Sequence, residues 1–546
     1  MNTTKALLVV TALGLTRPLQ SQDLLWRVEG VGGLINRGTD LHRMGDFNND
    51  GWEDLLELGV GWNGQQAFVA MRITSGYDGS ILSSGTPTPP GWVLANNAPL
   101  GDMNQDGVRD YGAHIYDGAN PVTTQTLAVF SGATHTPIWT ATIPSAWGTN
   151  FGAVLCGELD VNGDGRNDVV TSAYGLSPLG TIIVYDNSGA ELYRVIDPVP
   201  NVHVGLDVAN LRGDLDGDGF GDFVSSGPEP QNRGAIVCFS GRTGAVLRVS
   251  VGAQPGDKLV NAGACSDLDR DGVPDYCGGG SFGNSVVTAF SGATGQIIHS
   301  WRDTVNCCMG INVNGGYDLD QDGVPDLAAG SLSTYMNVFS GRDGTFLARW
   351  PATVPFCSGE VLAMLAPPPG EQYPVFVFSE RCWGGIPANG IAPGVVYAYR
   401  GCPRGVRRYG MADASPNQPL ARTGMRSPTA PTTPTVRFTM SDAPPGVAAM
   451  LTLGSSAASI GGVALPLGLD PFGLPGITLW TSADARLLTI AGTTGMDAGY
   501  AAFDIVLPPG RVIDYTGTPL YAQWLWFDPS NLSNHGSTAG QRFRLQ

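Results

Sequence analysis

The sequence carries little charge, and most of that charge is of one sign. Asp, Glu, Lys and Arg make up 14% of the 546 residues, and the formal net charge is −18. Nucleic acids need a basic surface, so we expect no nucleic-acid partner. The composition also excludes a coiled coil, a helical bundle and a disordered chain. With 77 Gly and 39 Pro, it favours an all-β protein with many short strands and tight turns.

Long apolar segments are also missing. Beyond the N-terminus no segment is apolar for long enough to span a bilayer, so we expect no transmembrane segment. At the N-terminus, Lys5 precedes an apolar stretch from Ala6 to Leu15 that is too short to span a membrane. This pattern predicts that residues 1–22 are a signal peptide and that the protein is secreted or lies at the cell surface.

The cysteines form no dense framework. Nine cysteines fit an oxidising compartment, and their odd number leaves at least one of them without an intramolecular partner. Cys265 and Cys277 flank one loop, so a disulfide between neighbouring strands could join them. The pairing of another group stays open: Cys307, Cys308, Cys357, Cys382 and Cys402.

Internal repetition dominates the chain. An acidic loop of nine residues occurs six times, with starts 56, 58, 54, 53 and 51 residues apart. An apolar run ending in Ser-Gly follows the same rhythm seven times, with a shifted third copy at Ser188-Gly189 and Arg400 replacing Ser in the seventh. The segments between these motifs predict strands, and the Ser-Gly segments predict turns. One repeat therefore holds about four strands, as in one blade of a β-propeller.

The two motifs together predict the number of blades. Six acidic loops and seven Ser-Gly turns favour seven blades, with Pro367–Gly370 where the seventh loop would stand. The N-terminal Leu24–Val28 resembles the strand that follows each Ser-Gly turn, although no turn precedes it. We expect this strand to complete the seventh blade and so remove the free edges of the array. Residues 23–402 are therefore predicted to form a seven-bladed β-propeller.

The acidic loops have the order of ligands that calcium prefers. Asp or Asn stands at positions 1, 3, 5 and 9 and Gly at position 6, so carboxylate oxygens converge in a tight turn. The carbonyl of position 7 adds a further oxygen. The predicted ligands are Asp46, Asn48, Asp50, Trp52, Asp54, Asp102, Asn104, Asp106, Val108, Asp110, Asp160, Asn162, Asp164, Arg166, Asp168, Asp214, Asp216, Asp218, Phe220, Asp222, Asp267, Asp269, Asp271, Val273, Asp275, Asp318, Asp320, Asp322, Val324 and Asp326.

An EF-hand does not fit these loops. It needs a bidentate Glu at position 12 and helices on both sides, whereas position 12 is acidic in one loop alone and the flanks are strand-like. The six acidic loops hold 21 of the 48 acidic residues of the chain. Six bound Ca²⁺ ions would add twelve positive charges and bring the net charge from −18 to about −6. We therefore expect about six structural calcium ions.

The loops and the Ser-Gly turns resemble the FG-GAP (VCBS-type) repeats of integrin α-subunit propellers and of many secreted bacterial proteins. In that family calcium sits between the first two strands of a blade, and its ligands match the positions given above. The resemblance covers residues 23–402 and implies a cell-adhesion type of function. Calcium-binding propellers also occur among polysaccharide lyases.

The periodicity ends near Gly410. Residues 403–435 are rich in Pro and Thr and predict a linker, and residues 436–546 alternate in a way that predicts a β-sandwich. In the segment from Leu520 to Phe527, four apolar residues fall on one face.

No motif indicates catalysis. The chain has no nucleophile elbow, and its six histidines are not in metal-binding spacing. We expect no catalytic residues and a non-enzymatic module that binds an extracellular glycan or protein. A calcium-dependent polysaccharide lyase or hydrolase is the alternative, because residues from several blades can form a site without a motif. Nothing in the sequence indicates an oligomeric state. Candidate stacking residues for sugars are Trp62, Trp92, Trp147 and Trp383.

Overall fold

The computed structural model describes most of the chain from residue 24 to residue 543. The segments that it does not describe within this range are 31–36, 63–66, 86–91, 118–124, 143–150, 174–179, 281–283, 304–308, 332–334, 352–357, 372, 381–393, 402–406, 410–411, 415–417, 427–434, 462, 471–476 and 507–519. The expected signal peptide, residues 1–22, lies outside the described residues. Helical conformation in the described part is limited to a 3₁₀ turn at Gly495–Asp497 and to Asp470, and no helix there could cross a membrane.

The prediction of an all-β fold is confirmed. Most of the chain forms four-stranded antiparallel sheets, with the strands of each sheet in sequence order except in the last, where β1 lies beside β28. The first sheet consists of β2 (Asp40–Gly45), β3 (Asp54–Trp62), β4 (Ala67–Thr74) and β5 (Ile81–Gly85), and the second of β6 (Trp92–Gly101), β7 (Asp110–Asp117), β8 (Gln125–Phe130) and β9 (Pro137–Thr142). The third consists of β10 (Phe151–Leu159), β11 (Asp168–Ala173), β12 (Thr181–Tyr185) and β13 (Glu191–Ile196), and the fourth of β14 (Asp207–Asn210), β15 (Phe223–Gly227), β16 (Ala235–Phe239) and β17 (Val246–Val251).

Three further sheets follow the same plan. They are β18 (Leu259–Ser266), β19 (Asp275–Gly280), β20 (Val286–Phe290) and β21 (Ile297–Arg302); β22 (Met309–Tyr317), β23 (Asp326–Ser331), β24 (Tyr335–Phe339) and β25 (Phe346–Pro351); and β26 (Ser358–Leu365), β27 (Val375–Glu380) and β28 (Val395–Arg400) with β1 (Leu24–Glu29) as the fourth strand.

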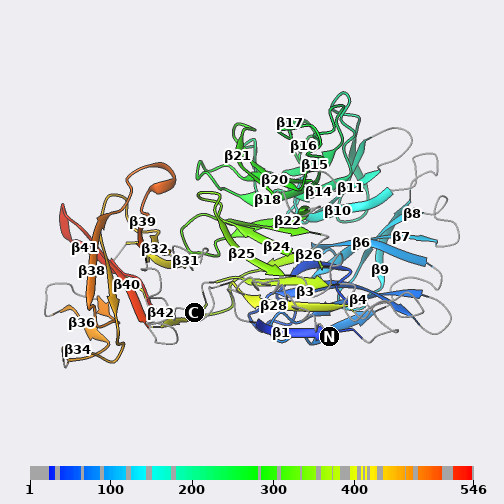
Figure 1. The fold of residues 1–546 in the computed structure, drawn as a ribbon. Coiled ribbons are helices and arrows are strands. Elements are labelled where there is room, and N and C mark those ends of the chain that lie inside the picture. The colour runs from blue at the N-terminus through cyan, green and yellow to red at the C-terminus, as the bar shows by residue number, and fades with distance from the viewer. Residues whose placement is uncertain are drawn as a thin grey trace, which may run out of the picture.

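The sheets are arranged like blades around an axis (Figure 1). The first strands of successive sheets contact one another, and β26 of the last sheet contacts β2 of the first. The second and third strands are buried because neighbouring sheets cover both faces, which explains their nearly continuous apolar sequences. Seven hydrophobic clusters fill the spaces between successive sheets, and one of them joins the last sheet to the first through Trp26, Leu41 and Val377.

The N-terminal strand completes the last sheet, as predicted. β1 pairs antiparallel with β28, and Val28 lies opposite Val396. Trp26 of β1 also donates a hydrogen bond from its indole nitrogen to the carbonyl of Gly76 in the first sheet, over 2.8 Å. The strand therefore links the two ends of the repeat array, and the edge of β28 is not left unpaired.

The C-terminal part consists of two main sheets over a shared core. A seven-stranded sheet and a three-stranded sheet both contribute to this core, whose largest members include Trp524, Trp526 and Phe438. The remaining strands form two small hairpins. The strands are β29 (Arg407–Tyr409), β30 (Asp413–Ala414), β31 (Arg422–Arg426), β32 (Thr435–Ser441), β33 (Ala448–Gly454), β34 (Ser459–Ile460), β35 (Val463–Ala464), β36 (Leu467–Gly468), β37 (Thr478–Leu479), β38 (Ala485–Ile490), β39 (Ala501–Val506), β40 (Leu520–Asp528), β41 (Asn531–Ser537) and β42 (Gly540–Phe543).

Part of the segment that we expected to be a linker belongs to these sheets. β29 pairs with β42, β30 with β41 and β31 with β32. The three strands are two to five residues long, so their own sequences carry little strand signal. β29 and β30 pair with strands near the end of the chain, and β31 pairs with the next strand, β32, and this pairing gives them their structure.

Candidate calcium loops

Each acidic loop joins the first strand of a sheet to its second strand. The loop that begins at Asp46 connects β2 with β3, and the loop that begins at Asp318 connects β22 with β23. The other four loops occupy the same place in their sheets. Because the first strands contact one another around the axis, the six loops lie at corresponding positions in a ring.

The loop from Asp214 to Asp222 shows the geometry that the motif produces. The two carboxylate oxygens of Asp214 accept the backbone N–H groups of Asp218, at 3.1 Å, and Gly219, at 2.6 Å. Asp218 in turn accepts the N–H of Phe220 at 3.0 Å. Gly219 has φ +89°, a conformation that strains any residue with a side chain. The turn therefore needs Gly at position 6, and position 6 is Gly in every copy.

The closing aspartate at position 9 also binds the Ser-Gly turn of its sheet, a contact that the motif alone does not predict. In the fourth sheet, one oxygen of Asp222 accepts the N–H of Leu215 at 2.6 Å, and the other accepts the N–H of Gly241 at 2.8 Å. Gly241 belongs to the Ser-Gly turn between β16 and β17. The same pair of bonds occurs in four other sheets, at Asp54, Asp110, Asp275 and Asp326. The acidic loop and the Ser-Gly turn are therefore two halves of one unit.

The glycine of the Ser-Gly turn is required by this contact. A Cβ added to Gly241 would lie 1.9 Å from the carbonyl oxygen of Gly221, the eighth residue of the loop. The corresponding clash at Gly341 would be 1.8 Å, with the carbonyl oxygen of Pro325. The third sheet has the shifted Ser-Gly copy, and there Asp168 accepts a side-chain hydrogen bond from Asn162 instead, at 3.4 Å. In the third sheet, the shifted Ser-Gly copy therefore goes together with a different hydrogen-bond partner of the closing aspartate.

The closing aspartates lie in surroundings that suit a cation. All six have no exposed surface. Burial raises the pKa of the carboxyl group despite the backbone donors, to about 6 for Asp54, Asp110 and Asp222 and to about 7 for Asp168 and Asp275. A divalent ion bound at the loop would offset both the burial and the repulsion from the neighbouring carboxylates.

The predicted acidic ligands come together in the last three loops. Carboxylate oxygens of three aspartates lie within 4.8 Å of one another in each of these loops. In the first two loops Asn stands at position 3, and its amide group donates to the aspartate at position 5. The oxygen-rich donor sets fit a hard cation such as calcium. The carbonyl ligands at position 7 and the bound calcium itself stay predictions.

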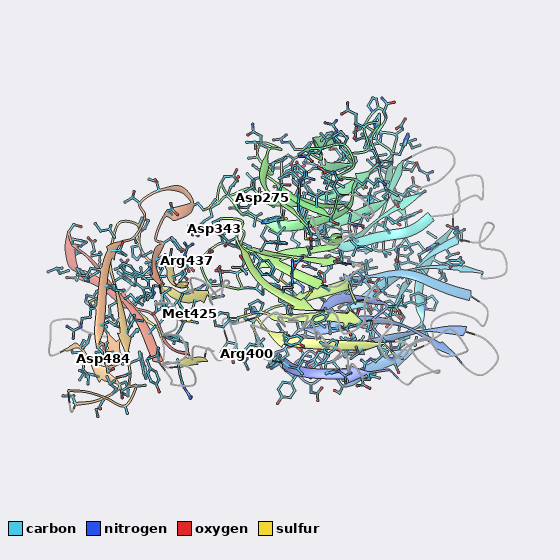
Figure 2. All side chains as sticks on the ribbon, viewed as in Figure 1. Asp275, Asp343, Arg400, Met425, Arg437 and Asp484 are labelled. Carbon is cyan, nitrogen blue, oxygen red and sulfur yellow. The ribbon has the colours of Figure 1, made fainter. Side chains whose placement is uncertain are left out.

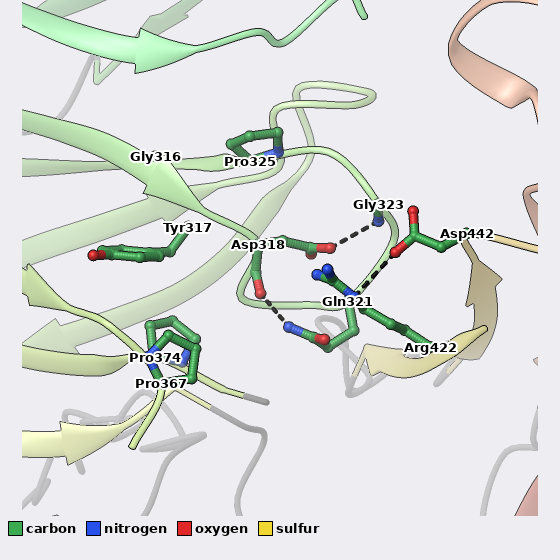
Figure 3. A pocket seen from close by; sticks show the side chains of 10 residues that line it. All are labelled: Gly316, Tyr317, Asp318, Gln321, Gly323, Pro325, Pro367, Pro374, Arg422 and Asp442. Atoms are coloured by element: carbon green, nitrogen blue, oxygen red, sulfur yellow. Dashed lines mark hydrogen bonds and ion pairs between the residues drawn. The ribbon is translucent and has the colours of Figure 1, made fainter. Parts of the chain in front are cut away.

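The sixth loop differs from the others because the C-terminal sheets cover it. Its Gln321 is 1% exposed and Asp322 is fully buried, whereas Asp50 and Asp106, equivalent to Asp322 in the first two loops, are exposed. Thr439 and Ser441 of β32 donate hydrogen bonds to the carbonyl of Gln321, each over 3.3 Å. Figure 3 shows the loop facing β31 and β32 across a cavity of about 240 Å³.

A second group of contacts fastens the same interface. Arg342, in the Ser-Gly turn of the sixth sheet, donates to the carbonyl of Asp322 at 2.9 Å and pairs with Asp497 at 2.8 Å. Its guanidinium carbon also lies 3.7 Å from the ring centre of Tyr500. Arg437 of β32 pairs with Asp343 over 3.0 Å, and Figure 2 shows the two residues between the two parts of the molecule.

The sequence gives one clue to the role of Arg342. Arg follows Ser-Gly in two turns, at Arg242 and at Arg342. Arg242 lies over the ring of Phe220 in its own acidic loop, 4.6 Å from the ring centre. The two arginines thus occupy the same position in the repeat, and only the tertiary contacts distinguish Arg342.

Other residues singled out in the sequence have less to contribute. Cys265 and Cys277 are buried free thiols, so the disulfide considered for them is absent, and burial raises the pKa of Cys265. Trp62 ends β3 and Trp92 begins β6. The remaining candidates lie outside the described residues: Trp147, Trp383, Cys307, Cys308, Cys357, Cys382 and Cys402.

The comparisons with known proteins support the resemblance seen in the repeats. No protein-family model matches the chain. The chain is 29% identical to integrin alpha-6 of Gallus gallus over 158 residues, which are 25% of this chain and 14% of that protein. The chain resembles integrin α-subunits. It covers only 14% of the length of this relative, so the activity of the whole integrin subunit is not transferred with the resemblance.

The solved structures that match the chain share little sequence with it. BBS1N in complex with ARL6DN has a TM-score of 0.43 and 11% identity, and the match covers 70% of this chain and 97% of that one. Sqt1 of Saccharomyces cerevisiae has a TM-score of 0.46 and 11% identity, with coverages of 70% and 99%. Raptor of Chaetomium thermophilum has a TM-score of 0.44 and 11% identity, with coverages of 70% and 30%.

Proposed function

We propose that the chain is a secreted, calcium-loaded, seven-bladed β-propeller that acts as a non-enzymatic binding module. Its ligand is an extracellular glycan or protein, and a C-terminal β-sandwich accompanies the propeller. The observation that carries this proposal is the repeated unit in which a buried aspartate joins an acidic loop to a Ser-Gly turn. The similarity to an integrin α-subunit supports a binding rather than a catalytic role.

Calcium has a structural task in this proposal. Each loop brings three or four carboxylates together, and their repulsion opposes the folded state when no cation is present. The closing aspartate also holds the Ser-Gly turn, so an ion bound at the loop stiffens the connection between all four strands of the sheet. Extracellular calcium modules bind at roughly 10⁻⁴ to 10⁻³ M, which is strong enough for extracellular fluid.

The proposed boundaries follow from the sequence and are adjusted by the strands. Residues 1–22 are the proposed signal peptide, and residues 23–402 the proposed propeller. The C-terminal module begins earlier than residue 436, because β29, β30 and β31 belong to its sheets.

Two measurements test the function directly. Metal analysis of the purified chain should find about six calcium ions for each molecule, as the six loops require, and fewer than three would contradict the assignment. The calcium-loaded chain should bind to an array of extracellular glycans and matrix proteins without releasing product. New unsaturated or reducing sugar ends would replace this proposal with a polysaccharide lyase or hydrolase.

A further inference from the structure

The C-terminal sheets contact three neighbouring sheets of the ring. Arg270, in the fifth acidic loop, donates hydrogen bonds to the carbonyls of Met496 and Ala498, over 3.4 and 3.5 Å. Gln541 of β42 donates to the hydroxyl of Tyr373 in the last sheet, over 2.9 Å. The third contact is the one with the sixth acidic loop, whose sheet stands between the fifth and the last in the ring.

The C-terminal sheets bury carboxylates of the sixth loop that are open in the other loops. Asp320, at position 3, is 4% exposed, and Asp322, at position 5, is fully buried. Asp216, the equivalent of Asp320 in the fourth loop, is exposed, and so is Asp271, the equivalent of Asp322 in the fifth. Among the six loops, the sixth is the one in which both positions are buried.

Two strands of the C-terminal part pack directly on the backbone of this loop. A Cβ added to Gly424 of β31 would lie 1.9 Å from the carbonyl oxygen of Asp320, and one added to Gly323 would lie 2.8 Å from the Cβ of Ser441 in β32. These contacts exclude water from the covered side of the loop. The cavity of about 240 Å³ that Asp318 lines leaves room for water ligands of a cation.

Covering this loop has an electrostatic cost. The loop carries four carboxylates, and oxygens of three of them lie within 4.8 Å of one another. Arg342 lies 3.5 Å from Asp322 but also pairs with Asp497 of the C-terminal part, so its positive charge is shared. Carboxylates that are brought together away from water oppose the docked arrangement, and a divalent cation at the loop would offset this repulsion.

We propose that docking of the C-terminal sheets is coupled to calcium binding at the sixth loop, so that this loop works as a calcium-dependent clamp between the two parts. The inference rests on the proposed calcium loading of the loops and adds a task that is particular to the sixth. The coupling is reciprocal: docking tightens calcium binding by the same factor by which calcium favours docking, typically about 5–150-fold. The covered ion therefore leaves its loop more slowly than the other five.

The kinetics of calcium release from the full chain test the coupling. The calcium-loaded chain is mixed rapidly with an excess of a fluorescent chelator, and the released calcium is followed in time. We expect one of the six ions in a phase that is at least about fivefold slower than the rest. Arg342→Ala should abolish the slow phase, whereas Arg242→Ala, at the same position of the fourth sheet, should keep it. Loss of a positive charge beside the loop would by itself slow calcium release, so faster release in Arg342→Ala reports undocking.

The reverse direction is tested by removing one ligand in calcium buffer. Asp320→Ala removes a carboxylate of the sixth loop, and Asp216→Ala removes its equivalent in the fourth loop. The two aspartates accept the N–H of the aspartate at position 5 over the same 3.2 Å, so both variants lose the same local contact. Limited proteolysis between the two parts should be at least about fivefold faster in Asp320→Ala than in Asp216→Ala.

The outcomes separate this inference from the proposed function. Release of about six ions without a slow phase, a slow phase that persists in Arg342→Ala, or equal cleavage of the two aspartate variants would overturn the coupling and leave the calcium loading intact. A chain that releases no calcium in any phase would contradict the proposed function and the coupling with it. If circular dichroism shows that Asp320→Ala does not fold, the release kinetics of the parent chain and Arg342→Ala decide.

Discussion

The glycine of the Ser-Gly turn offers the sharpest test of how the repeat is built. In Gly241→Ala, the new Cβ would lie 1.9 Å from the carbonyl oxygen of Gly221, and backbone atoms occupy that space. The turn must move away, and the bond from its N–H to the buried carboxylate of Asp222, now 2.8 Å long, is lost or weakened.

The expected cost follows from these two effects. Overpacking of a buried site costs about 1–3 kcal/mol, and a buried group left without its hydrogen bond costs about 1–3 kcal/mol. Together they predict a loss of about 2–6 kcal/mol in the free energy of unfolding. The calcium affinity of the fourth loop should fall as well, because Asp222 closes that loop.

Ser240→Ala is the matched control within the same turn. The hydroxyl of Ser240 is buried and has no hydrogen-bond partner in the described structure, so its removal should change stability by less than about 0.5 kcal/mol. Urea unfolding of both variants and the parent chain, followed by circular dichroism in calcium buffer, measures the difference. Equal stability of Gly241→Ala and Ser240→Ala would refute the claim that loop and turn form one unit.

Three further perturbations address calcium, pH and the interface. Chelation with EGTA should lower the unfolding temperature, and Asp218→Ala should remove one bound calcium ion; an unchanged melting curve or an unchanged calcium count contradicts the structural role of the metal. Burial lowers the pKa of His114 to about 4, below its unfolded value near 6.5, so the stability present above pH 6.5 should fall by about 3 kcal/mol as the pH drops to 4. His114→Gln should lack this loss in urea unfolding, and an identical pH profile would show that another group titrates. Arg342→Ala should loosen the C-terminal sheets, with limited proteolysis between the two parts at least several times faster than in Arg242→Ala, and equal rates would exclude Arg342 as the fastening residue.

Much of the fold could be predicted because the repeats are strong local signals. The spacing of the acidic loops and Ser-Gly turns predicted four-stranded units, and an unpaired strand at Leu24–Val28 predicted the pairing of β1 with the last sheet. These inferences depend on periodicity and on the need to satisfy strand edges, which a sequence displays directly. The linker prediction was less successful, since β31 is a strand only because β32 lies beside it.

The sequence by itself determined the repeat, the oxygen-rich loops and the positions where Gly is needed for a left-handed turn. Only the tertiary structure decided that Asp222 reaches Gly241, that the sixth loop is covered by β32, and that Arg43 of the first sheet reaches Tyr317 of the sixth. The physical reason is that the six loops are alike within themselves. Their differences arise from contacts with residues about 20 to more than 150 positions away, and no local pattern records those contacts.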